Sequence, residues 1–81
     1  MSSFPEELPA PGQVIGPINH HGTDYTFRGI TDGHWIIDGP QGIKTEVRRT
    51  PDGTMTMVRT DGHTSNDGYG DNWEELAEQY F

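Results

Sequence analysis

The sequence predicts a mostly β domain of the α+β class, with four or five antiparallel strands in a meander and one short C-terminal α-helix. The strands would form a curled sheet or a small SH3-like barrel. Five of the seven aspartates precede a glycine, and Asp-Gly favours turns because Gly accepts positive φ and Asp bonds to nearby backbone. Between these turns lie alternating segments rich in Thr, Val, Ile and aromatic residues, which are typical of strands.

The predicted strands lie within residues 13–60, and residues 13–81 form a single small domain. Residues 13–18 are a short edge strand interrupted by Gly16-Pro17, and the other strand segments are 25–30, 34–37, 43–50 and 54–60. Residues 1–12 contain three prolines and few apolar residues. They are predicted to be a flexible Pro-rich tail.

One hairpin has a predictable register. Pro51-Asp52-Gly53 suits a three-residue loop in which the glycine is left-handed. Thr50 then faces Thr54, Val47 faces Met57, and Glu46 faces Val58. Side-chain alternation predicts that one apolar face of the sheet contains Tyr25, Phe27, Trp35, Ile37, Ile43, Val47, Met55 and Met57. The opposite face would carry Ile30, Ile36 and Val58 among Lys44, Glu46, Arg48, Thr54 and Thr56.

Residues 61–70 are predicted to be an acidic loop, and residues 71–81 a helix. Asp71 would be its N-cap and Glu74 the capping-box residue. An apolar stripe follows at helical spacing on Trp73, Leu76, Ala77 and Tyr80. So short a helix is not stable alone. It either covers its own sheet, beside Ile30, Ile36 and Val58, or docks on another protein.

The net charge is −8, and residues 61–81 contribute six acids without a Lys or Arg. This balance disfavours anionic membranes and direct nucleic-acid binding, since phosphate contacts depend on basic side chains. There is no cysteine, which excludes disulfides and Cys-based zinc sites. Because neither a signal peptide nor a membrane-spanning run is visible, we expect a soluble cytoplasmic protein.

The sequence contains few motifs that indicate catalysis or cofactor binding. No nucleophile elbow or phosphate-binding glycine loop is present, so we expect a protein that is not an enzyme and has no cofactor. Residues 63–74 resemble an EF-hand loop loosely, with His63 where the first ligand should be Asp. An alternative function is therefore a calcium-responsive module with the ligands Asp61, His63, Asp67, Asp71 and Glu74.

The preferred function is a non-catalytic acidic module that inhibits or regulates a partner protein. An inhibitor, an antitoxin or immunity-type protein and a phage-type regulator all suit this size and charge. The partner would have a basic or apolar surface, and mimicry of nucleic acid is one form of the hypothesis. The predicted contact residues are Trp73, Glu75, Leu76, Glu78 and Tyr80. A homodimer is also compatible with the sequence, and nucleic-acid binding by Arg28, Lys44 and Arg48 on one sheet face is a third function.

Overall fold

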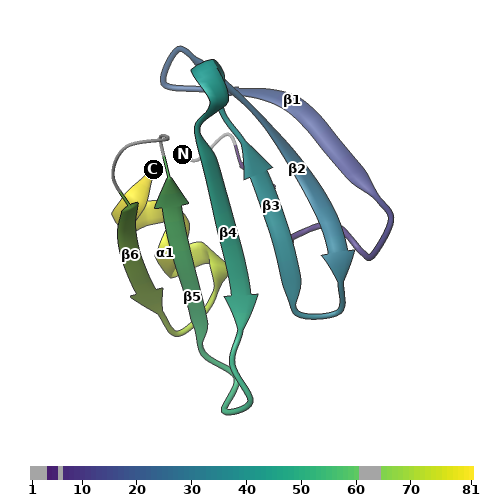
Figure 1. Cartoon of the computed structure of the whole chain (residues 1–81), viewed down its shortest axis with the longest axis vertical. Coiled ribbons are helices and arrows are strands. Elements are labelled where there is room, and N and C mark those ends of the chain that lie inside the picture. The colour runs from purple at the N-terminus through teal and green to yellow at the C-terminus, as the bar shows by residue number, and fades with distance from the viewer. Residues whose placement is uncertain (1–3, 6, 61–64) are drawn as a thin grey trace.

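The computed structural model describes residues 4–5, 7–60 and 65–81. Within these residues, six antiparallel strands form one sheet in sequence order (Figure 1): β1 (Val14–His20), β2 (Thr23–Thr31), β3 (His34–Asp38), β4 (Lys44–Arg49), β5 (Met55–Thr60) and β6 (Ser65–Gly70). A short 3₁₀ turn, η1 (Pro40–Gly42), follows β3, and the helix α1 (Trp73–Tyr80) follows β6. The predicted fold class is confirmed, as an open sheet with β1 and β6 at its edges.

The predicted hairpin register is also confirmed. Glu46 pairs with Val58 and Val47 with Met57 across β4 and β5. The Thr50 N–H donates to the Thr54 carbonyl at 2.8 Å, which closes the loop as expected. The two faces divide as the alternation predicts, since Phe27, Ile37, Val47 and Met57 are all buried on one side.

The sequence did not predict β6, which lies in the segment expected to be an acidic loop. Its sequence, SNDGYG, lacks the β-branched residues that mark strands. The glycines are needed for packing, however. A Cβ added at Gly68 would lie 2.7 Å from Met57 Cγ and 2.8 Å from Tyr80 Cε2. Glycine therefore lets β6 pair with β5 while α1 lies directly above it.

The N-cap of the helix lies one residue later than predicted. Its N-cap is Asn72, whose side-chain oxygen accepts from the Glu75 N–H at 2.9 Å, and Asp71 lies outside. α1 contacts β5 and β6, and its residues Trp73, Leu76 and Ala77 join the same core as Phe27 and Val47. The prediction that it covers Ile30, Ile36 and Val58 is wrong. No helix in the described part of the chain is long and apolar enough to cross a bilayer.

The N-terminal segment (residues 4–5 and 7–12) packs on the core instead of forming a flexible tail. The Phe4 side chain is only 7% exposed and its ring meets those of Phe27 and Tyr25 edge to face, at 5.1 and 5.4 Å between centroids. The two tryptophan indoles hold this segment: Trp73 Nε1 donates to the Pro5 carbonyl at 3.0 Å, and Trp35 Nε1 to the Pro9 carbonyl at 2.7 Å. The prolines of this segment predicted a tail because their spacing does not reveal that the Pro5 and Pro9 carbonyls accept hydrogen bonds from the two indoles.

The helix and the N-terminal segment therefore cover the same face of the sheet. On the other face, register aligns one residue from each of β2 to β6 in a row: Arg28, Ile36, Glu46, Val58 and Asp67. Val58 is 39% exposed and Ile30 41% exposed on this face. We call it the open face.

Candidate functional site

Two arginines and a histidine on the open face are paired with acids, whereas Lys44 and Asp67 form no ion pair among the described residues. Arg28 Nε donates to Asp38 Oδ2 at 2.7 Å. Glu46 Oε1 accepts from Arg48 Nη2 at 3.0 Å, and His34 Nε2 lies 2.8 Å from the same oxygen. The hydrogen bonds from Arg48 and then from His34 lower the pKa of Glu46. Arg28 and Arg48 are thus largely neutralised by adjacent acids.

One exposed aromatic residue lies on the open face, although none was predicted there. Tyr69 of β6 pairs with Thr56 and is 58% exposed. Sequence reasoning missed it because residues 61–70 were predicted to be a loop. Bases stack on aromatic platforms flanked by free cations, whereas two of the three cations predicted for this face, Arg28 and Arg48, already have carboxylate partners. Lys44 is exposed and forms no ion pair among the described residues.

The remaining arginines are also engaged within the sheet domain. Arg49 Nη1 lies 3.7 Å from Asp32 Oδ1, and the Arg49 guanidinium carbon is 5.1 Å from the centroid of the Trp35 ring. Arg59 lies 5.9 Å above the Phe81 ring. Among the described residues, no ion pair joins an arginine to the C-terminal acids.

Five carboxylates at one side of the molecule consequently have no Lys or Arg partner among residues 4–5, 7–60 and 65–81. We call this group the acidic edge: Asp67, Asp71, Glu74, Glu75 and Glu78. Asp67 belongs to β6, Asp71 follows it, and the three glutamates belong to α1. Glu75 also accepts a hydrogen bond from the Asp71 N–H, at 3.4 Å.

The structure distributes the predicted contact residues between core and surface. Trp73 is 7% exposed and Leu76 is fully buried, so both belong to the core alternative that the sequence left open. Tyr80 is 36% exposed, Glu75 is half-buried, and Glu78 is exposed. In this conformation, Glu75, Glu78 and part of Tyr80 are accessible to a partner protein.

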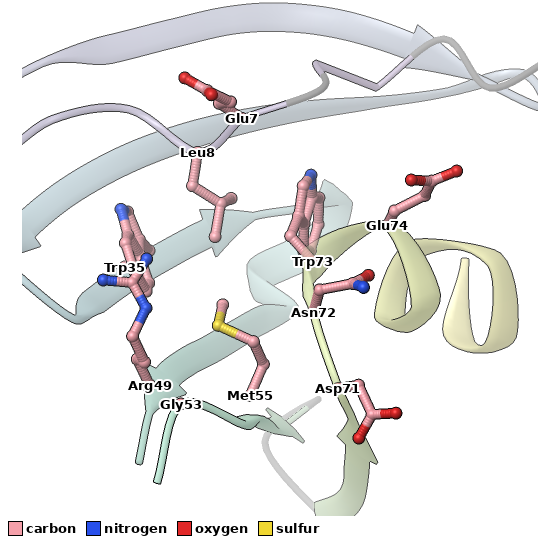
Figure 2. Close-up of a pocket in the computed structure, with 10 residues that line it drawn as sticks. All are labelled: Glu7, Leu8, Trp35, Arg49, Gly53, Met55, Asp71, Asn72, Trp73 and Glu74. Atoms are coloured by element: carbon pink, nitrogen blue, oxygen red, sulfur yellow. The ribbon is translucent and has the colours of Figure 1, made fainter. Parts of the chain in front are cut away.

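A pocket of about 490 Å³ lies between the N-terminal segment and the start of α1. Figure 2 shows Leu8 pointing between the two tryptophans, with Met55 beside it. Its apolar lining is Leu8, Trp35, Met55 and Trp73. Its charged lining is Glu7, Arg49, Asp71 and Glu74. The sequence did not predict this pocket, because the N-terminal segment that forms one of its walls was expected to be a tail.

The predicted calcium ligands lie partly outside the described residues, since Asp61 and His63 belong to residues 61–64. Asp67, Asp71 and Glu74 are described and belong to the acidic edge. Across the described residues, no group of three or more His, Asp or Glu side chains is placed to hold a metal ion. The calcium hypothesis gains no geometric support from the part of the loop that is described.

Comparison with known proteins identifies no relative of this chain. No family model matches the chain, and neither curated proteins nor solved structures include a significant match. The fold defines an open antiparallel sheet with one face covered by a helix and by the N-terminal segment. Its function is therefore inferred from its own residues.

Proposed function

We propose that this protein is a non-catalytic binding module that inhibits or regulates a partner protein by placing its acidic edge against a basic surface. The observation that carries the proposal is the separation of charges. In the described residues, each arginine that forms an ion pair does so with an acid outside the acidic edge. The acidic edge thus retains its charge for an external partner.

The arrangement of α1 supports this proposal. Glu74 and Glu78 are four residues apart in the helix and so share one side of it. A like-charged pair at this spacing destabilises a helix by a few tenths of a kcal/mol. No basic residue occupies the last turn of α1 to offset that cost. A basic partner would relieve the repulsion on binding, which favours association with the helix.

Complementary charge would act mainly on the rate and specificity of association. Salt should weaken it, because exposed charges are screened over a Debye length of about 8 Å at physiological ionic strength. A partner that itself binds nucleic acid has a basic surface of the required kind. The carboxylates would then occupy positions that phosphates normally take.

An octa-arginine peptide is a suitable probe of the acidic edge. We expect its titration into ¹⁵N-labelled protein at low salt to shift the amide signals of β6 and α1 above all others. Glu78→Lys should weaken binding about three- to fivefold, because an exposed ion pair contributes up to about 1 kcal/mol.

Asp32→Lys is the matched control, since it makes the same change in net charge at a 93% exposed side chain on the β2–β3 turn. Equal weakening by both variants would reduce the effect to net charge alone and overturn the proposal. Signals that shift mainly in β2, β3 and β4 would also contradict it.

A further inference from the structure

We propose that the pocket between the N-terminal segment and the start of α1 receives an arginine side chain of the basic partner. This inference rests on the proposed function and names the chemical group that the acidic edge recognises. The pocket volume, about 490 Å³, falls within the range of roughly 300–1,000 Å³ common for ligand sites. It is therefore large enough for one long side chain and the backbone that carries it.

The walls suit the aliphatic stem and the flat guanidinium of arginine. Leu8, Met55 and two indole rings provide apolar surface. Arginine buries its methylene groups on such surface while its charged end stays at a polar rim. The planar guanidinium also stacks on aromatic faces, which the compact lysine ammonium does less well.

The protein's own Arg49 shows that this environment accepts a guanidinium. Its guanidinium carbon lies 5.1 Å from the centroid of the Trp35 ring, within the distance of about 6 Å for a cation–π contact. Arg49 is also part of the pocket lining (Figure 2). A second arginine, entering from a partner protein, would find another indole ring in the pocket wall at Trp73.

The charged lining favours a cation. Three acidic residues, Glu7, Asp71 and Glu74, contribute to the lining against one arginine, and Figure 2 shows their carboxylates pointing away from its apolar centre. Among the described residues, none of the three has a Lys or Arg partner. Carboxylates bind a guanidinium through short, charge-assisted and often bidentate hydrogen bonds. An anionic ligand would instead face a net repulsion from this lining.

The pocket is built before any ligand arrives. The hydrogen bonds from Trp73 to Pro5 and from Trp35 to Pro9 lie on either side of Glu7 and Leu8 in the N-terminal segment. They fix the wall to which both residues belong. Such preorganisation reduces the ordering cost of binding. Because the chain has two tryptophans and both line the pocket, indole fluorescence and indole N–H signals report its occupancy.

The test uses a blocked Gly-Arg-Gly peptide with the full-length protein. We expect saturable changes in tryptophan fluorescence and in both indole N–H signals. The lysine peptide should bind more weakly, and the citrulline peptide, which keeps the shape of arginine without its charge, weaker still. A Gly-Glu-Gly peptide that binds better than the arginine peptide would overturn the proposal, as would equal binding of arginine and citrulline.

Two matched pairs of variants locate the site. Glu74→Gln should weaken the arginine peptide about threefold or more, whereas Asp24→Asn, the same loss of one negative charge at an exposed residue of β2 outside both the acidic edge and the pocket lining, should leave it unchanged. Arg49→Gln removes the competing cation and should tighten binding about threefold. Arg48→Gln, on the open face, should not. An unchanged affinity in both Glu74→Gln and Arg49→Gln contradicts the assignment of the pocket.

The two proposals fail in different ways. If octa-arginine binds the acidic edge but the short arginine peptide leaves both indole signals unmoved, the pocket proposal is wrong and the proposed function stands. If neither peptide binds at low salt, both are wrong.

Discussion

Trp73 and Pro5 are 68 positions apart in sequence, yet the indole N–H of the first donates to the carbonyl of the second at 3.0 Å. Trp35 makes the same kind of bond to Pro9 at 2.7 Å. A buried indole N–H needs an acceptor. The two bonds therefore join the N-terminal segment to the start of α1 and to the centre of the sheet, and they form one wall of the pocket.

Trp73→Phe should destabilise the protein by about 1–3 kcal/mol, because it removes one hydrogen bond and part of a buried ring. Urea unfolding measures the change. Faster amide exchange at Glu7, Leu8 and Ala10 should accompany it, since the variant releases Pro5. Tyr69→Phe is the control: its side chain is 58% exposed, and the change should stay within about 0.5 kcal/mol. Equal stability of Trp73→Phe and wild type would show that this bond does not hold the segment.

Gly68→Ala should destabilise the protein by about 1–3 kcal/mol through overpacking between β6 and α1. The added methyl would lie 2.7 Å from Met57 Cγ and 2.8 Å from the Tyr80 ring. Gly39→Ala is a matched control, because its methyl would approach no atom closer than 3.4 Å. Thermal unfolding of the two variants gives the comparison. Identical melting temperatures would mean that α1 does not approach β6 as closely as the structure shows.

Asp52→Asn should change how stability depends on pH. Hydrogen bonds from the Thr50 and Thr54 hydroxyls and from the Thr54 N–H lower the pKa of Asp52 from 3.8 to about 2. A lowered pKa stabilises the folded state above the ordinary pKa, and this contribution is lost as the pH falls from about 4 to about 2. Urea unfolding at pH 2, 3, 4 and 7 should show a difference between wild type and variant that shrinks towards pH 2. A difference constant with pH would contradict this role of the Asp52 carboxylate.

The parts of the fold that depend on local chemistry could be predicted from the sequence. The loop Pro51-Asp52-Gly53 and the alternation around it predict the pairing of Val47 with Met57 correctly, because turn geometry and a two-residue period determine register locally. β6 could not be predicted in this way. Gly68 and Gly70 carry no strand preference, and their role depends on a helix that packs against them.

The candidate site shows the same division. The excess of acids after residue 60 is visible in the sequence, but their lack of partners depends on where five basic side chains point. Arg28 and Arg48 bond to acids on their own face because register places those acids next to them. The pocket depends on Glu7 and Leu8, which belong to a segment whose anchors are distant in sequence.

Sequence alone was sufficient to predict the strand-rich class, the register of one hairpin, the two faces of the central strands and the concentration of negative charge at the C-terminal end. These follow from turn residues, side-chain alternation and charge, all of which act over a few residues. The three-dimensional structure was needed to show which face α1 covers, that the N-terminal segment packs beside it, and that a pocket opens between them. Those features depend on contacts between residues far apart in the chain, such as Trp73 with Pro5.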